Sequence, residues 1–119
     1  MFTIATILII HFFFDFVFQS HWMATNKSKN NAALALHVAI YSSGVCLMTI
    51  LNFPLFSFGT ACAFIFLNTI WHFLTDYITS RLSSKRWAEQ RWHDFFVIIG
   101  LDQVCHYLTL FGLLYILTA

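Results

Sequence analysis

Four long apolar stretches constrain the fold of this chain more than any other feature of its sequence. They cover residues 2–19, 32–51, 56–79 and 95–117. A helix that crosses the hydrocarbon core of a bilayer needs about 20 mostly apolar residues, so each stretch is long enough to span a membrane. We therefore predict an all-α integral membrane protein, with four transmembrane helices in a single domain over residues 1–119.

The composition agrees with this class of protein. Of the 119 residues, 60% are hydrophobic and only 9% are charged, whereas a soluble domain is about 25% charged. The formal net charge of +1 gives no basic surface for nucleic acid, so we expect no nucleic-acid partner. The three cysteines stand alone in apolar stretches, without the spacing of a zinc knuckle or a disulfide framework.

The basic residues predict the topology. All six lysines and arginines fall in the first and third connections, residues 20–31 and 80–94, and none falls in residues 52–55 or near either terminus. With four helices, the first and third connections lie on the same side. The positive-inside rule then puts both connections in the cytoplasm and both termini on the non-cytoplasmic side. The third connection is expected to open with a short interfacial helix near Trp87 and Trp92.

Ionisable residues interrupt the apolar stretches. A charged side chain at mid-depth in a bilayer costs about 2.5–3.5 kcal/mol on insertion scales. Such residues persist when they are paired, neutralised or bound to an ion. The chain places seven histidines and aspartates in its predicted spans: His11, Asp15, His37, His72, Asp76, Asp102 and His106.

The spacing of these residues indicates that they converge. Six of them form pairs four residues apart, which share one face of a helix: His11 with Asp15, His72 with Asp76, and Asp102 with His106. Counted at about 1.5 Å per residue from the cytoplasmic ends, all seven lie roughly 6–18 Å deep. For any single pair, a helix-to-helix hydrogen bond that fixes packing is the simpler interpretation. Three pairs and His37 at similar depth favour a common site.

Imidazoles and carboxylates that converge from several helices form a ligand set for a divalent transition metal. We expect zinc first, with manganese or iron as alternatives. Seven candidates exceed the needs of one tetrahedral ion, so we predict one or two ions. The predicted metal ligands are His11, Asp15, His37, His72, Asp76, Asp102 and His106. Gln19 and Gln103 are predicted to hydrogen-bond to these ligands and orient them.

These motifs resemble those of a known family. They are HFFFDFVFQ at 11–19, WM at 22–23, NK at 26–27, His37, HFLTD at 72–76 and DQVCH at 102–106. In this order, over nearly the whole chain, they resemble the DUF3307 family of small bacterial and phage inner-membrane proteins of unknown function. The chain is more loosely similar to membrane proteins predicted to be metal-dependent hydrolases. The resemblance implies a multi-pass protein of the bacterial inner membrane, with its site at these motifs, and implies no substrate.

The first functional hypothesis is a membrane-embedded metal-dependent hydrolase. Asp15 would act as general base or bridge two ions, and His106 would be a ligand or the proton donor to the leaving group. A site just below the cytoplasmic surface suits a lipid or lipid-linked substrate. Arg81, Lys85 and Arg86 would hold an anionic headgroup, or serve topology alone.

Two other hypotheses remain open. An ion or proton conductor, or a metal transporter, would use the same intramembrane residues, although the outer half of the spans contains no ionisable residue. A structural or regulatory phage-related protein would use the metal only to hold its helices together. In each case the bilayer is a partner, and the large apolar surface leads us to expect a homo-oligomer.

Overall fold

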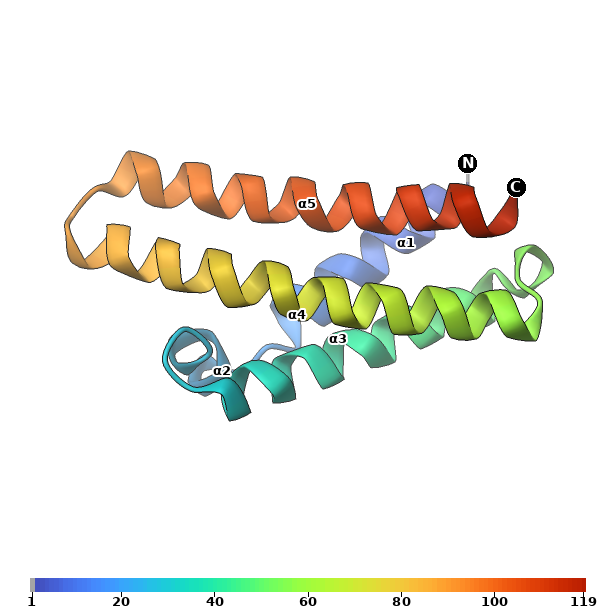
Figure 1. The fold of residues 1–119 in the computed structure, drawn as a ribbon, viewed down its shortest axis with the longest axis horizontal. Helices are drawn as coiled ribbons and strands as arrows, with labels where there is room; N and C mark the ends of the chain where they lie inside the picture. The colour runs from blue at the N-terminus through green and yellow to red at the C-terminus, as the bar shows by residue number, and fades with distance from the viewer. Residues whose placement is uncertain (1) are drawn as a thin grey trace.

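The computed structural model describes residues 2–119, and every regular element in that range is helical (Figure 1). The elements in chain order are α1 (Phe2–Phe12), the π-helical turn η1 (Phe13–Val17), α2 (His21–Asn26), α3 (Asn31–Leu51), the 3-10 turn η2 (Phe53–Leu55), α4 (Phe58–Ala88) and α5 (Trp92–Thr118). The prediction of an all-α chain is therefore confirmed.

Three helices are long and apolar enough to cross a membrane, which suggests a membrane protein. They are α3 with 21 residues, α4 with 31 and α5 with 27. The first predicted span differs, because its apolar helical stretch covers only Thr3–Val17. At 1.5 Å per residue this stretch rises about 22 Å, less than the roughly 30 Å of a hydrocarbon core. The prediction of four full-length spans is thus not supported.

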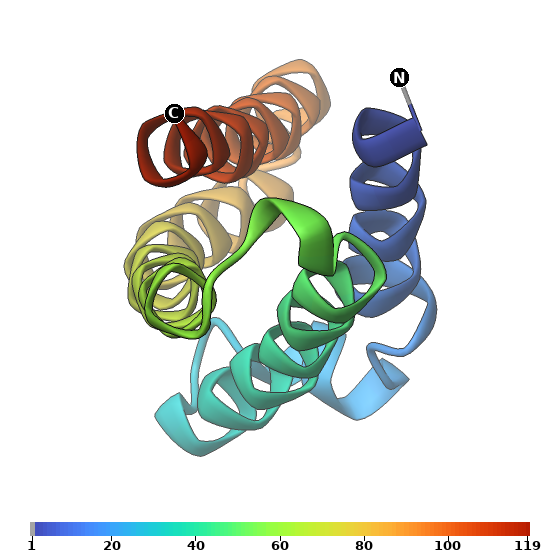
Figure 2. The same ribbon diagram turned by 90° about the vertical axis from the view of Figure 1, so that its right-hand side faces the viewer.

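The four longer helices α1, α3, α4 and α5 lie around a common axis (Figure 2). The two termini lie at one end of the bundle, and α2 and the α4–α5 turn lie at the other (Figure 1). All six lysines and arginines belong to the α2–α3 connection, the last turns of α4 and the α4–α5 turn. We call this end of the bundle the basic end.

The connections at the basic end are more helical than the sequence predicts. Ser20 caps α2 by accepting a hydrogen bond at its Oγ from the Met23 N–H, at 3.2 Å. The short interfacial helix expected near Trp87 is continuous with α4, which ends at Ala88. The turn into α5 then needs a left-handed residue, and Gln90 takes that conformation with φ of 57°.

The turn η1 sets the position of Asp15. Its π-helical bond runs from the Phe18 N–H to the Phe13 carbonyl at 2.8 Å, and π turns inside helices often occur at functional sites. Gly44 of α3 allows η1 to pack closely, since a Cβ at Gly44 would lie 2.5 Å from Cγ of Phe14. Asp15 is therefore held against α3, with 4% of its surface exposed.

The apolar core fills the half of the bundle that is closer to the termini. Its buried members are Ile7, Ile10, Tyr41, Val45, Met48, Phe64 and Leu110. The polar residues of the site lie one or two helical turns closer to the basic end than the core residues of the same helix. His11 lies one turn beyond Ile7, and His72 lies two turns beyond Phe64. The outer faces of the helices expose many large hydrophobic side chains. The core thus closes the polar site on one side.

Candidate metal centre

Three elements bring four buried side chains to one point. Asp15 comes from η1, His37 from α3, and His72 and Asp76 from successive turns of α4. Each is at most 4% exposed. His37 Nε2 lies 3.1 Å from Asp15 Oδ1 and 3.1 Å from Asp76 Oδ2. His72 Nε2 lies 3.5 Å from each of the same two oxygens and 3.2 Å from His37 Nε2.

These spacings fit a tetrahedral metal site. Zinc binds nitrogen and oxygen ligands at about 2.0–2.1 Å, so adjacent ligand atoms of a regular tetrahedron lie roughly 3.3–3.4 Å apart. Five of the six edges of this set measure 3.1–3.5 Å. The four atoms could therefore hold a metal ion with little movement. We call this set, formed by Asp15 Oδ1, His37 Nε2, His72 Nε2 and Asp76 Oδ2, the first position.

A second group lies beside it and shares Asp15. One ligand atom each of Asp15, Asp102 and His106 lies within metal-binding range of the other two. His106 Nε2 is 3.2 Å from Asp102 Oδ2 and 3.1 Å from Asp76 Oδ1. Asp76 thus presents one oxygen to each group. We call the group of Asp15, Asp102 and His106 the second position.

Gln103 connects the second position to His11. Its Nε2 donates to Asp15 Oδ2 at 3.3 Å and to Asp102 Oδ2 at 3.1 Å, and its Oε1 lies 2.9 Å from His11 Nε2. This geometry fits the orienting role predicted for Gln103. His11 belongs to neither group of candidate ligands. Its Nε2 faces Gln103 Oε1 and lies 3.5 Å from Asp15 Oδ2. We therefore assign His11 to the support of Asp15.

Aromatic packing positions two of the imidazoles. His72 is stacked between Tyr41, with ring centroids 3.8 Å apart, and His106, at 4.1 Å. The Nδ1 atoms of His37 and His72 are buried and have no hydrogen-bond partner. Metal-bound histidines usually donate this second N–H to a protein acceptor. Here ring stacking orients His72 in place of that hydrogen bond.

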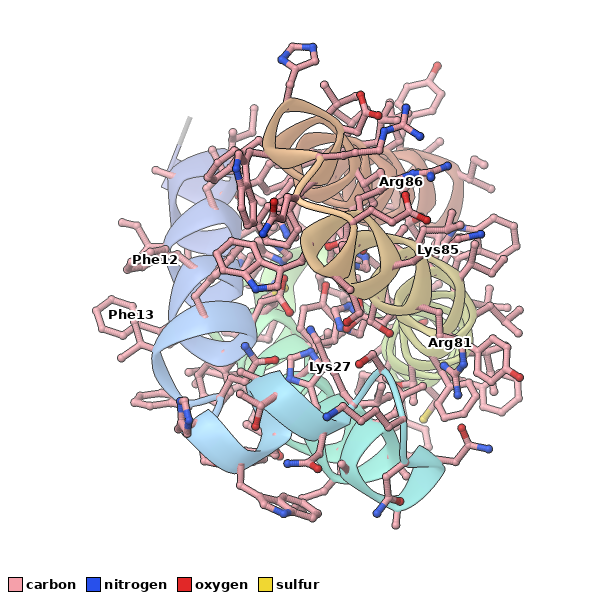
Figure 3. All side chains as sticks on the ribbon, turned by 90° about the vertical axis from the view of Figure 1, so that its left-hand side faces the viewer. Phe12, Phe13, Lys27, Arg81, Lys85 and Arg86 are labelled. Carbon is pink, nitrogen blue, oxygen red and sulfur yellow. The ribbon has the colours of Figure 1, made fainter. Side chains whose placement is uncertain are left out.

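A lysine that the sequence analysis assigned only to a connection reaches the site. Lys27 Nζ lies 3.1 Å from Asp76 Oδ2, and the lysine side chain is 19% exposed. In Figure 3 Lys27 lies near the middle of the basic end, whereas Arg81, Lys85 and Arg86 lie along the outer side of α4. Arg81 bonds Asn31 Oδ1 at 2.8 Å and Arg86 bonds Glu89 at 2.8 Å. Lys27 is therefore the cation at the candidate site.

The carboxylates of the cluster outnumber its one lysine. With neutral imidazoles, Asp15, Asp76 and Asp102 carry three negative charges and Lys27 carries one positive charge, which leaves −2. Uncompensated charge inside a helical bundle costs several kcal/mol per ion. One divalent cation would neutralise the cluster, and so would protonation of two imidazoles.

A polar cavity of about 200 Å³ adjoins the second position at the basic end. Asp15, Asp102, Gln103 and Lys27 contribute to its wall, together with Ser80, Ser83 and Ser84 of α4. Gln19, predicted to orient the ligands, instead lines this cavity, and its Oε1 is buried without a partner. His106 does not line the cavity. The cavity therefore offers a small polar group a way to approach Asp15 and Asp102.

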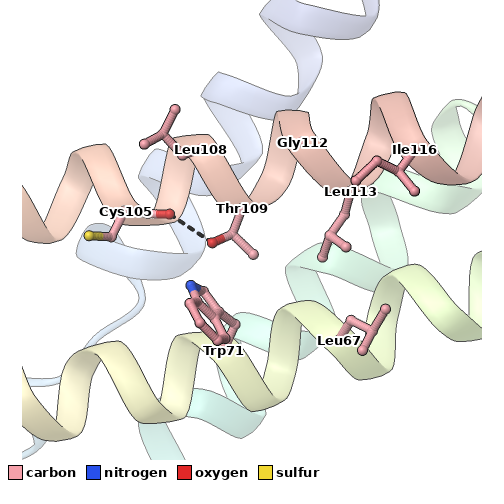
Figure 4. A pocket seen from close by; sticks show the side chains of 8 residues that line it. All are labelled: Leu67, Trp71, Cys105, Leu108, Thr109, Gly112, Leu113 and Ile116. Carbon is pink, nitrogen blue, oxygen red and sulfur yellow. Dashed lines mark hydrogen bonds between the residues drawn. The ribbon is translucent and has the colours of Figure 1, made fainter.

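A second hollow is apolar and lies apart from the site. It has a volume of about 460 Å³ between α4 and α5, and Leu67, Trp71, Cys105 and Gly112 are among its lining residues (Figure 4). None of the seven predicted ligands lines it. Cys105, although adjacent in sequence to His106, thus faces this hollow.

Sequence reasoning missed four residues of the site: Lys27, Tyr41, Thr79 and Ser80. Thr79 donates to Asp102 Oδ1 at 2.5 Å, and both Thr79 and Ser80 continue the α4 stripe of His72 and Asp76 by one turn. That spacing could have indicated them. Tyr41 lies one turn after His37 and could have been found in the same way. For Lys27 the only signal is its presence in the NK motif.

The fold and site define a class: a helical chain with membrane-length helices and a buried His/Asp cluster that could hold a metal ion. The chain belongs to the family described as protein of unknown function, DUF3307, which matches residues 3–119. The comparisons with curated proteins and with solved structures found no match. The predicted membership of this family is therefore confirmed, whereas the similarity to metal-dependent hydrolases is not shown.

Proposed function

We propose that this chain is a membrane-embedded metal-dependent hydrolase of the bacterial inner membrane that acts on a lipid or lipid-linked substrate. The observation that carries the proposal is the near-tetrahedral spacing of the first position beside a second position that borders a polar cavity. With neutral imidazoles, as metal binding requires, the buried site carries a net charge of −2, which supports the binding of a divalent cation, for which we propose zinc.

In the proposed hydrolase, some residues of the site would bind metal and one would transfer a proton. The first position would hold one ion, and Asp102 and His106 would hold a second with the shared carboxylates. Such ions acidify water and polarise the oxygen of a phosphoryl or carbonyl group. Asp15 lines the cavity, so with a single ion at the first position its Oδ2 is placed to accept the proton of the attacking water. With a second ion bound, Asp15 would bridge the two ions instead. Because His106 does not line the cavity, we assign it to holding metal and not to donating a proton.

The proposed topology has four membrane segments, with the basic end in the cytoplasm and both termini on the other side. The common end of the two termini and the six basic residues at the opposite end support it. The short α1–η1 segment would then cross a locally thinned bilayer or be shielded by its neighbours. The site would lie in the cytoplasmic half, next to the headgroups.

A structural metal is the second candidate function, and one observation favours it. Four protein atoms already complete a tetrahedron at the first position, as in structural zinc sites, whereas catalytic sites keep one position open. In that case the ion would fix η1, α3 and α4 to each other. The second position and its cavity are what favour an enzyme.

Conduction and metal transport are less well supported. Between the cluster and the termini, the described buried residues are mostly apolar. The polar side chains there are Asn68, Thr49 and Asn52, and each bonds to a backbone carbonyl three or four residues earlier, at 2.8, 2.7 and 2.8 Å. A conducting path needs polar groups or water through both halves of the membrane. Among the buried side chains described, the half of the bundle closer to the termini contains no carboxylate, imidazole or basic group.

Metal analysis and a lipid panel test the proposal. The purified protein should retain one or two equivalents of zinc per chain, and His72→Ala should lose zinc while His93→Ala, at an exposed site, keeps it. Asp15→Asn should retain the fold but lose hydrolysis of the lipid that the wild type cleaves. A zinc-free wild type after incubation with zinc would overturn the proposal. A loaded protein with no water-accessible ion would favour the structural alternative.

A further inference from the structure

We infer that the polar cavity at the basic end binds a phosphate group, which makes the substrate of the site a phosphate ester. The inference rests on the proposed function for the reaction, but phosphate binding by itself can be measured independently. The cavity is the one lined by Lys27, Ser80, Ser83 and Ser84 together with the site carboxylates Asp15 and Asp102.

The cavity wall contains polar atoms that the fold leaves unused. Ser80 is 7% exposed and its Oγ has no hydrogen-bond partner. Gln19 Oε1 is likewise buried without a partner. An unpaired buried polar group destabilises the folded state, so a fold that tolerates two of them beside one cavity is suited to a polar ligand. Hydroxyl and amide groups donate to phosphate oxygens, and the amide does so after a simple flip.

The charge at the cavity favours an anion once metal is bound. Lys27 provides an ammonium group at the wall, 3.1 Å from Asp76 Oδ2. Ions in both positions would change the net charge of the cluster from −2 to +2. A phosphate monoester carries about two negative charges near neutral pH and would restore neutrality. A phosphate also presents more acceptor oxygens than a carboxylate. It can therefore accept hydrogen bonds from Lys27, which follows α2, and from Ser80 of α4 at the same time.

The surroundings of the cavity favour a lipid-linked phosphate over a soluble one. Phe16, Phe95 and Ile99 form apolar parts of the wall. A neighbouring hollow of about 430 Å³ shares Ala24, Ser84 and Phe95 with the cavity and adds Lys29 and Trp87. Tryptophan and lysine suit the headgroup level of a bilayer. A lipid phosphate could therefore enter from the membrane surface with its chains beside the bundle.

Equilibrium dialysis with radiolabelled orthophosphate tests the inference. Wild-type protein in phosphatidylcholine nanodiscs is measured both loaded with zinc and stripped of metal. Lys27→Gln and Ser80→Ala are each expected to weaken phosphate binding by about tenfold or more, since a hydrogen bond to a charged group contributes about 1.5–3 kcal/mol. Lys85→Gln and Ser43→Ala are the matched controls at exposed positions, and both should bind like the wild type.

A second arm identifies the source of the phosphate. Nanodiscs that contain phosphatidic acid should block orthophosphate binding if the natural ligand is a lipid phosphate, and diacylglycerol of the same chain length should not. If phosphatidic acid does not compete while orthophosphate binds, the ligand is a soluble phosphate ester. Either result supports the phosphate site and chooses between its sources.

The inference and the proposed function fail in different ways. If the wild type binds no phosphate in either metal state, or if the Lys27→Gln and Ser80→Ala variants both bind it as tightly as the wild type, the phosphate site is wrong even when zinc is retained. If phosphate binds but zinc does not, the phosphate site stands and the metal-dependent hydrolase is wrong. Circular dichroism and the zinc content of Ser80→Ala separate loss of the ligand from loss of the fold.

Discussion

The Nε2 atoms of His37 and His72 lie 3.2 Å apart, although the two residues belong to different helices. Between two neutral imidazoles, one hydrogen at most can occupy that contact, so one ring donates and the other accepts. Yet both nitrogens also face the oxygens of Asp15 and Asp76 at 3.1–3.5 Å. A cation at the centre would satisfy all four atoms at once, and the following prediction tests this arrangement.

Removing the metal should destabilise the protein. A ligand present at about 100 times its dissociation constant stabilises the folded state by roughly 2.7 kcal/mol. We therefore expect a strong chelator to lower the unfolding temperature of zinc-loaded protein measurably, and added zinc to restore it. In His72→Ala the chelator should have no effect, whereas His93→Ala should respond like the wild type. An unfolding temperature of the wild type that ignores both chelator and zinc would contradict this prediction.

Lys27→Met should change two measurements in opposite directions. Without metal, loss of the ammonium group leaves Asp76 facing the other carboxylates, so the free energy of unfolding should fall by about 1–3 kcal/mol. With metal, the affinity for zinc should rise, because no ammonium group competes for Asp76 Oδ2. Lys85→Met, which alters an exposed lysine, should change neither quantity. Competition with a fluorescent chelator measures the affinity, and equal affinities in Lys27→Met and the wild type would refute the competition.

Gly44→Ala should disturb the site from outside it. The added Cβ would meet Phe14 at 2.5–2.9 Å, so either the phenyl ring or the η1 turn that carries Asp15 must move. Overpacking of this kind costs about 1–3 kcal/mol. Gly112→Ala is the matched control, because nothing lies within 4 Å of a Cβ at Gly112. We expect lower stability and weaker zinc binding for the first variant alone, measured by thermal unfolding and metal competition.

Much of the site could be predicted because periodicity alone places residues on helix faces. The pairs His72 with Asp76 and Asp102 with His106 lie together because an α-helix aligns residues four apart. Their convergence with His37 is predicted from the similar distance of these residues from the helix ends, counted along the sequence. That reasoning needs no knowledge of how the helices pack, and the structure brings the predicted residues of α3, α4 and α5 into contact at 3.1–3.5 Å.

The remaining features depend on tertiary packing that the sequence does not encode locally. The α-helix of the first apolar stretch ends at Phe12, and a π turn follows, although no proline or glycine marks the change. The apolar helical stretch, with this turn included, ends at Val17 and is therefore too short to count as a full span, and His11 faces Gln103. Lys27 reaches Asp76 because α2 packs at the basic end of the bundle. A count of positive charges in the sequence could not distinguish Lys27 from Lys85.

The location of the N-terminus tests whether the short first segment crosses the membrane. In a variant without native cysteines, Thr3→Cys should react with a membrane-impermeant maleimide added to intact spheroplasts. Lys29→Cys, at the basic end, should react only after the membrane is opened. This result follows if four segments cross the bilayer and the basic end is cytoplasmic. Labelling of both positions only after opening would mean that α1 does not cross.

Substitution of a ligand that belongs to only one position should remove the zinc ion from that position alone. Asp102 belongs only to the second position, whereas Asp15 belongs to both. If two ions bind, Asp102→Asn should reduce the zinc content from two equivalents per chain to one, and Asp15→Asn should reduce the affinity of both ions. An amide cannot supply the negative charge that the carboxylate brings to the ion, so the change removes charge with little change in volume.

Asp94→Asn is the matched control for this comparison, because Asp94 pairs with Arg91 at the α4–α5 turn and lies outside both positions. Zinc content is measured by mass spectrometry after exhaustive dialysis against a weak chelator. Equal zinc content in Asp102→Asn and wild-type protein would mean that the second position holds no ion. Asp102 would then serve only as a hydrogen-bond partner of His106 Nε2 at 3.2 Å, Thr79 at 2.5 Å and Gln103 at 3.1 Å. In that case the closed first position would carry the metal alone, and the structural alternative would gain over the enzyme.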